Sequence, residues 1–179
     1  GRLLFKGEPV SRHSQAFRKM LGVVPQELAI YPDLSAQENL VFFGRLYGLR
    51  APKLTDRVTW ALERVGLTSN AHRNASTFSG GMKRRLNFAV ALLHEPKILM
   101  LDEPTVGVDP QSRAHLLACV RDLRDAGTAI IYASHYMEEV QTLCDRVLII
   151  DHGKSLASGT LDELLERVQT SLRVQINGG

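Results

Sequence analysis

The sequence is poor in the features of disulfide-bonded and membrane-spanning proteins. It has only two cysteines, Cys119 and Cys144, and both lie in apolar helical patterns. Two such cysteines supply neither a disulfide framework nor the spacing of a metal site, and they fit a reducing cytosol. No apolar run approaches the roughly 20 residues of a membrane-spanning helix. The composition therefore predicts a fold that depends on an ordinary hydrophobic core.

The sequence also has only a small excess of positive over negative charge. The 22 Lys and Arg residues nearly balance the 19 Asp and Glu residues, which gives a net charge of +3. The basic residues are dispersed along the chain, so the sequence does not indicate binding to nucleic acid. With 179 residues, of which 44% are apolar, the chain can bury one sizeable core, alone or with a small subdomain.

Short apolar runs alternate with helical patterns along the chain. The runs at residues 21–24, 98–101 and 128–133 predict buried strands. The second run has no polar interruption, which is typical of a strand buried on both faces in a parallel sheet. Strands that alternate with helices indicate an α/β fold with a mostly parallel sheet.

Residues 34–85, in contrast, predict helices only. This stretch begins with a capping box at residues 35–38 and continues with apolar residues at helical spacing. We therefore expect a single domain over residues 1–179, in which an α/β core of residues 1–33 and 86–179 carries an all-helical subdomain.

Polar side chains follow the three predicted strands. Gln26 follows the first strand, Asp102 and Glu103 follow the second, and His135 follows the third. Ligands of open α/β sheets bind at the carboxyl ends of the strands. A carboxylate for a hard cation, a second carboxylate to orient water, a Gln and a His together suit phosphoryl transfer. Taken singly, the same residues also fit a solvated strand end, a turn and a helix cap.

Ser79-Gly80-Gly81 supplies a second candidate site. A glycine pair lets backbone N–H groups approach an anion closely, and the helix that follows points its positive N-terminus to the same place. The alternative is that Ser79 is only an N-cap and the glycines only a hinge. Asp109, directly before Pro110, likewise fits an N-cap with proline at the first helical position.

Five segments of the chain, taken in order, resemble motifs of the nucleotide-binding domain of ATP-binding cassette (ABC) transporters. They are Gln26 for the Q-loop, residues 78–82 (FSGGM) for the signature, residues 98–103 (ILMLDE) for the Walker B strand and its glutamate, residues 106–109 (VGVD) for the D-loop, and His135 for the switch histidine. The resemblance spans essentially the whole chain. It implies a P-loop NTPase-like (RecA-like) fold that is incomplete at the N-terminus.

The resemblance also implies roles in ATP hydrolysis with Mg²⁺. Asp102 would hold the Mg²⁺, and Glu103 would polarise the attacking water as a general base. Gln26 would contact the metal or the water and respond to the membrane partner. His135 would contact the γ-phosphate.

The remaining residues would act across a dimer. The resemblance implies that Ser79, Gly80 and Gly81 clasp the γ-phosphate of a nucleotide bound to the opposite subunit. Asp109, grouped with these nucleotide-binding residues, would lie at the dimer interface.

Two departures from the family pattern matter. The signature has Phe78 and Met82 where the family has Leu and Gln, and Lys83-Arg84-Arg85 follow. This variant resembles the branch of ABC exporters that includes drug-resistance, lipid and polysaccharide export systems.

The second departure is that the sequence contains no G-x-x-x-x-G-K-[ST] phosphate loop (Walker A). Gly153-Lys154-Ser155 imitates its end, but Leu148 occupies the required glycine position, and the segment predicts a hairpin turn. In the family this loop precedes the strand that residues 2–5 resemble. We therefore expect the chain to be an N-terminally truncated fragment that by itself binds ATP weakly and does not hydrolyse it.

The resemblance implies an ATP-binding subunit that drives export across a membrane. Its partners would be a transmembrane permease subunit and a second ATPase subunit, in a homodimer or heterodimer, and not nucleic acid. It would lie in the cytoplasm, peripherally on the cytoplasmic face of the membrane. The alternatives are a soluble ABC ATPase that acts on ribosomes or DNA, and a non-catalytic regulatory cassette.

Overall fold

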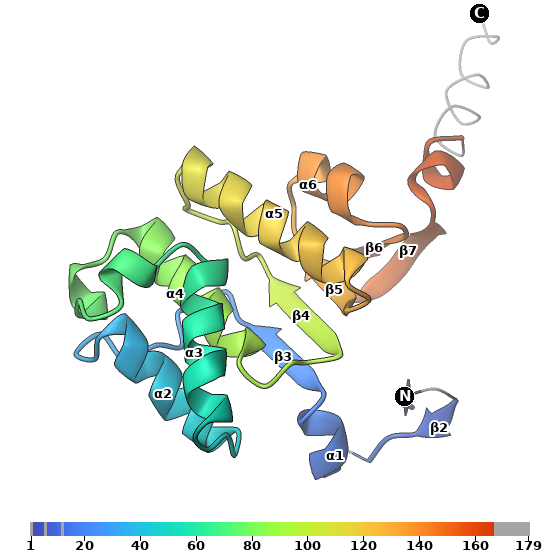
Figure 1. Cartoon of the computed structure of the whole chain (residues 1–179). Helices are drawn as coiled ribbons and strands as arrows, with labels where there is room; N and C mark the ends of the chain where they lie inside the picture. Colours follow the sequence, from blue (N-terminus) through green and yellow to red (C-terminus); the bar gives the residue numbers. More distant parts are fainter. Residues whose placement is uncertain (1, 6, 12, 167–179) are drawn as a thin grey trace, which may run out of the picture. The chain divides into compact units, whose positions relative to one another are not determined.

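The computed structural model describes residues 2–5, 7–11 and 13–166 of the chain. It divides into two compact units, Gly1–Ala133 and Ser134–Gly179, which are described separately (Figure 1).

A three-stranded parallel sheet forms the centre of the first unit. Its strands are β3 (Leu21–Val24), β4 (Ile98–Asp102) and β5 (Ala129–Ala133), in the order β3-β4-β5 (Figure 1). Both pairings are parallel, with Val24 opposite Leu101 and Asp102 opposite Ala133. The predicted α/β fold with a parallel sheet is confirmed.

The helix α4 (Gly80–Leu92) packs closely on this sheet at Gly22. A Cβ atom at Gly22 would collide with the carbonyl oxygen of Ala91 and the ring of Pro96, so only glycine permits this approach of helix and strand. The residues of α4 from Leu86 onward are buried, as their unbroken apolar pattern predicts.

The opposite face of the sheet corrects the prediction that the strand at residues 98–101 is buried on both sides, and the predicted buried strand at residues 128–133 has only half-buried and exposed residues in β5. Val23, Met100 and Ile131 are 48%, 39% and 55% exposed, and they are register partners across the three strands. Leu99 and Leu101 are buried. Successive side chains of a strand point to opposite faces, and α4 packs on the face that carries Gly22. The apolar run at residues 98–101 thus supplies apolar side chains to both faces of the sheet, but the described residues bury only one of these faces.

Helices fill the segment between β3 and β4. They are α2 (Ala36–Leu46), α3 (Lys53–Arg64), the 3₁₀ turns η1 (Thr68–Asn70) and η2 (Ala75–Thr77), and α4. Figure 1 shows α2, α3 and α4 side by side, and each of the three contacts the other two. The expected capping box at Ser35 and Glu38 is confirmed. The division at residues 34–85 into a subdomain stays a prediction.

Helical spacing predicts that Ala114, Leu117, Val120 and Leu123 of the helix α5 (Pro110–Asp125) point inward, and of these only Val120 is buried. The buried residues of α5 are Ser112, Leu116, Cys119 and Val120. The inward position predicted for Ala114 is wrong, because that residue is exposed. Cys119 Sγ donates a hydrogen bond to the carbonyl oxygen of Arg64 at the end of α3, and this contact turns the cysteine side of α5 inward.

The remaining elements of the first unit are short. They are β1 (Leu4–Phe5), β2 (Glu8–Pro9), which pairs with β1 in an antiparallel hairpin, and α1 (Gln15–Arg18).

The second unit contains α6 (Met137–Leu143) and a hairpin of β6 (Val147–Asp151) and β7 (Lys154–Gly159). Positive φ angles of 46° and 73° at His152 and Gly153 form its turn, which confirms the predicted hairpin.

A helix begins at residue 161 of the second unit. The sequence pattern of Thr160 and Glu163 predicts a capping box here, and it is confirmed, because the two residues exchange hydrogen bonds between side chain and backbone. The apolar pattern of residues 172–176 also predicts a strand, and these residues lie outside the part of the chain that the structure describes.

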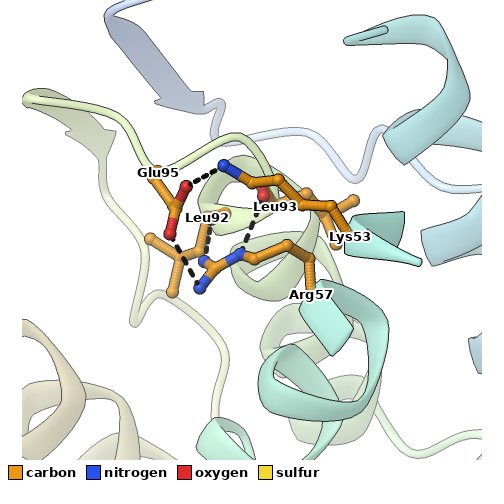
Figure 2. A network of polar contacts seen from close by, with 5 residues as sticks. All are labelled: Lys53, Arg57, Leu92, Leu93 and Glu95. Carbon is orange, nitrogen blue, oxygen red and sulfur yellow. Dashed lines mark hydrogen bonds and ion pairs between the residues drawn. The ribbon is translucent and has the colours of Figure 1, made fainter. Parts of the chain in front are cut away.

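Arg57 of α3 donates hydrogen bonds to backbone carbonyl oxygens at the C-terminal end of α4 (Figure 2). Its guanidinium donates hydrogen bonds of 2.8 and 3.0 Å to the carbonyl oxygens of Leu92 and Leu93. Glu95 lies 3.5 Å from the same guanidinium and 2.7 Å from Nζ of Lys53. Leu92 and Leu93 are buried, so these carbonyl oxygens need donors from the protein. Arg57 thereby joins α3 to the point where α4 ends.

Replacement of Arg57 tests this junction. Arg57→Ala leaves the carbonyl oxygen of Leu93 unpaired, while that of Leu92 keeps the backbone N–H of Glu95 as a donor, so the free energy of unfolding is expected to fall by about 2 kcal/mol. Urea denaturation followed by circular dichroism measures the change. The matched control is Lys53→Ala, which removes only an ion pair between side chains that are 60% and 52% exposed, and is expected to change stability by less than about 1 kcal/mol. Equal effects of the two variants would contradict the role of Arg57.

Candidate functional site

Glu103 and Gln26 meet at the carboxyl edge of the sheet. The backbone N–H of Glu103 donates to the carbonyl oxygen of Ala133 at 2.9 Å, so the residue stays attached to β5 after β4 has ended. The Gln26 side chain donates from Nε2 to Oε2 of Glu103 at 3.3 Å. The structure thus brings together two of the residues that the sequence pattern singled out, although 77 positions separate them.

The backbone of Glu103 has an unusual conformation. Its φ angle is +45°, in the left-handed region that residues other than glycine adopt rarely. Residues held in this region often mark functional sites, because the surrounding structure must maintain the strain. Here the bond to Ala133 holds the backbone while the carboxylate reaches Gln26.

Asp102 ends β4 with an exposed side chain. The described residues contain no cluster of three or more His, Cys, Asp and Glu side chains that could hold a metal ion alone. Mg²⁺ suits this arrangement, because it usually takes one or two protein carboxylates and completes its coordination with water and phosphate oxygens. The Asp102 carboxylate and the amide oxygen of Gln26 are ligands of the chemical kind that Mg²⁺ takes, and their joint binding of the metal stays a prediction.

Ser79 caps the N-terminus of α4. Its Oγ accepts a hydrogen bond of 3.2 Å from the backbone N–H of Met82, so the N-cap interpretation is correct. Ser79 and Gly80 are exposed, which leaves the positive end of a 13-residue helix open to an anion.

Gly81 joins this helix end to Asp109. A Cβ atom at Gly81 would collide with Oδ2 of Asp109 and Oγ of Ser112, so the contact requires glycine. Asp109 caps α5 by accepting a 2.9 Å bond from the backbone N–H of Ser112. Hydrogen bonds from the backbone and side chain of Ser112 hold the pKa of Asp109 below its usual value. The carboxylate therefore stays ionised beside the start of α4.

His135 belongs to the second unit. Its exposed ring lies against Tyr136 with 4.2 Å between ring centroids. The backbone around it is held by Ser134, whose Oγ accepts from the N–H of Tyr136 and donates to the buried carboxylate of Glu139. A joint site of His135 with Gln26 and Glu103 stays a prediction.

Sequence reasoning missed the side chains that hold the Gln26 loop, which we define as residues 25–35. Arg84 and Asn87 of α4 bond to its first part, and Asn39 of α2 bonds to its second part. The only signal in the sequence is the basic run at residues 83–85, which does not show what Arg84 contacts.

Comparison with known proteins adds independent evidence. The family model of the ABC transporter matches residues 1–106. The chain is 46% identical to the linearmycin resistance ATP-binding protein LnrL of Bacillus subtilis (strain 168) over 99% of its own length and 58% of that protein. It is 39% identical to the Nod factor export ATP-binding protein I of Rhizobium sp. (strain N33), over 100% of the chain and 59% of the relative.

A solved structure is similar as well. The cbiO1 structure from Clostridium perfringens, described as part of the ABC transporter complex cbiONQ, superimposes with a TM-score of 0.80 at 27% identity, over 99% of this chain and 72% of that one. The chain spans 58% and 59% of the lengths of the two curated relatives above. Because the family model covers more than half of the chain, and the strand-end and signature motifs have the geometry described above, the chain belongs to the ABC transporter family, in its ATP-binding part.

Proposed function

We propose that this chain is part of an ATPase subunit that couples ATP hydrolysis to export across a membrane. The observation that carries the proposal is the hydrogen bond between Gln26 and Glu103 at the carboxyl edge of the sheet. The pair supplies a carboxylate that can take a proton from water and an amide that can orient the same water molecule. Hydrolysis of a phosphoanhydride needs these two functions. The names of the relatives, in drug resistance and Nod factor export, favour export.

In this proposal each residue at the sheet edge has a separate task. Glu103 accepts a proton from the attacking water as the general base, while Gln26 orients that water. Asp102 and Gln26 would hold Mg²⁺, which would offset the negative charge of the phosphates. His135 belongs to the second unit and not to the sheet, and it would donate a hydrogen bond to the γ-phosphate.

The exposed start of α4 serves a second subunit in the same proposal. Ser79, Gly80 and Gly81 bind the γ-phosphate of a nucleotide held by the partner subunit, and Asp109 lies at the interface between the two. The packing of Gly81 on Asp109 supports this role, because it places both motifs on one surface of the chain. The working form is then a dimer with two composite sites.

A transmembrane permease docks beside the Gln26 loop in this proposal. No helix among the described residues is long and apolar enough to cross a bilayer. Leu28 and Tyr31 of the loop are 41% and 47% exposed, and the Tyr31 ring contacts Phe42 of α2 with 4.9 Å between centroids. Phe42 also lines a groove along α2, together with Glu38, Val41, Arg45 and Leu46. This apolar surface suits a short amphipathic helix of the permease, which would hold the subunit at the cytoplasmic face of the membrane.

The two alternatives have less support. A soluble ABC ATPase acting on ribosomes or DNA has no counterpart in the two curated relatives named above, which are a resistance protein and an export protein. A regulatory cassette would not need to keep Glu103 in a strained conformation in contact with Gln26.

Substitution of the proposed base tests the function directly. Glu103→Gln keeps the side-chain length but cannot accept a proton, so the kcat for ATP in the complete protein is expected to fall by roughly 10²- to 10⁴-fold while nucleotide binding persists. Phosphate release and equilibrium binding of a fluorescent ATP analogue measure the two effects. Glu63→Gln, at an exposed position of α3, is the matched control. Turnover by Glu103→Gln near the wild-type rate would refute the role of Glu103.

Packing at Gly81 gives a second test. In Gly81→Ala the new methyl group collides with Asp109 and Ser112, so the free energy of unfolding is expected to fall by about 1–3 kcal/mol. Thermal unfolding measures this loss. At Gly80 the nearest atom to a new Cβ is the Gly107 carbonyl oxygen at 3.9 Å, so Gly80→Ala should melt close to wild type. If both variants melt alike, the contact of Gly81 with Asp109 is not tight.

The permease surface can be tested by charge. Leu28→Glu puts a carboxylate into the proposed interface and is expected to weaken association with the permease about tenfold. Co-purification and substrate export by the complex measure the effect. Leu165→Glu makes the same change at a position that is 49% exposed in the second unit, and serves as the control. Intact association and export in Leu28→Glu would exclude this docking surface.

A further inference from the structure

The Gln26 loop is bonded at both ends to helices. At its far end Asn39 of α2, which is fully buried, accepts a 2.8 Å hydrogen bond from the N–H of Tyr31. The same side chain donates to the carbonyl oxygens of Tyr31, Leu34 and Ser35 at 2.9, 3.3 and 3.0 Å. One side chain thus replaces the hydrogen bonds that secondary structure would supply, and this end of the loop is fixed on α2.

The near end of the loop is held by α4. Arg84 donates from Nη1 to the carbonyl oxygens of both Pro25 and Gln26. Asn87, which is 3% exposed, accepts a 3.0 Å bond from the N–H of Ala29 through Oδ1. Arg84 and Asn87 are three positions apart, so they lie on the same face of the helix. Contact with the loop is specific to this face of α4, because the neighbouring Arg85 donates hydrogen bonds to the carbonyl oxygens of Val65 and Gly66 at the end of α3 instead.

Burial strengthens these bonds. Burial lowers the pKa of Arg84 from its usual value, but an arginine remains charged at neutral pH. A charged donor that has lost part of its hydration depends on its carbonyl partners, so releasing the loop would leave the guanidinium half-buried and unpaired. The bond between α4 and the Gln26 loop is therefore expected to persist when either element moves.

The same helix also carries the signature at its N-terminus. Ser79 caps α4, and Arg84 lies five residues further on, roughly 8 Å along the axis. A helix that is buried along most of its length transmits displacement as a rigid rod. A movement of the Ser79 end is thus passed to the main chain of Gln26, whose side chain contacts Glu103.

We propose that Arg84 and Asn87 are positioning residues that make the Gln26 loop move with α4, so that Gln26 contacts Glu103 in concert with the position of the signature. This inference rests on the proposed ATPase function, which assigns Ser79 to the partner's nucleotide and Glu103 to the chain's own. The two residues then connect the two composite sites of a dimer through one helix.

Hydrogen–deuterium exchange tests the attachment without any turnover. In the complete protein, Arg84→Gln is expected to speed amide exchange at residues 26–31 at least about tenfold, because it removes the charged donor. Arg84→Lys keeps the charge and one donor group, so it should restore part of the protection. Arg85→Gln is the matched control from the adjacent position, and it should leave exchange at residues 26–31 unchanged. Unchanged exchange in Arg84→Gln would overturn the proposal.

A double-mutant cycle tests the positioning role. Arg84→Gln is expected to lower kcat for ATP about tenfold with little change in KM, within the range for displaced catalytic groups. In a Gln26→Ala background the same substitution should have almost no further effect, because its action passes through Gln26. Arg85→Gln should act equally in both backgrounds. Additive effects of Arg84→Gln and Gln26→Ala would overturn the positioning role.

The two failures are distinguishable. Absence of ATP turnover in the wild-type protein would overturn the proposed function, and the exchange experiment would still decide whether Arg84 attaches the loop to α4. Normal turnover with additive substitutions would leave the ATPase assignment intact and refute the coupling through Arg84.

Discussion

The parallel pairing of β4 between β3 and β5 is the constraint on which the site depends. Val24 lies opposite Leu101, so Gln26 and Glu103, each two residues further along, leave the sheet together. A slip of one residue would turn the side chains of β4 to the other face and separate the pair. The buried side chains of Leu99 and Leu101 favour this register, and the proposed catalytic contact therefore depends on burial several residues away.

The helix α4 connects the parts of the site that the sheet does not. Its first residues form the proposed anion-binding end, its second turn holds the Gln26 loop through Arg84 and Asn87, and Arg57 donates to its last carbonyl oxygens. Gly22 lets its backbone touch β3. The same helix thus contacts the sheet, the Gln26 loop and α3. These contacts explain how motifs that are far apart in the sequence keep fixed positions relative to one another.

Local patterns predicted much of this structure. The α/β class, the capping boxes at Ser35 and Thr160, and the hairpin at Gly153 follow from residues close in sequence. The open face of the sheet and the rotated inner face of α5 were not predictable, because hydrophobicity does not show which neighbour covers a side chain. The contact of Arg84 with Gln26 spans 58 positions and leaves no periodic signal.

The left-handed backbone conformation at Glu103 is unfavourable for glutamate, although the proposed chemistry needs a carboxylate there. Glycine, and to a lesser degree asparagine and aspartate, adopt this conformation with less strain than glutamate, and β-branched residues are strongly disfavoured. Selection for stability alone would therefore favour residues that cannot act as the proposed general base, because none of them carries a carboxylate at the same distance from the backbone. Conservation of glutamate at this position among natural variants would therefore indicate selection for ATP turnover. Relatives that have lost activity are expected to carry glycine or asparagine at this position.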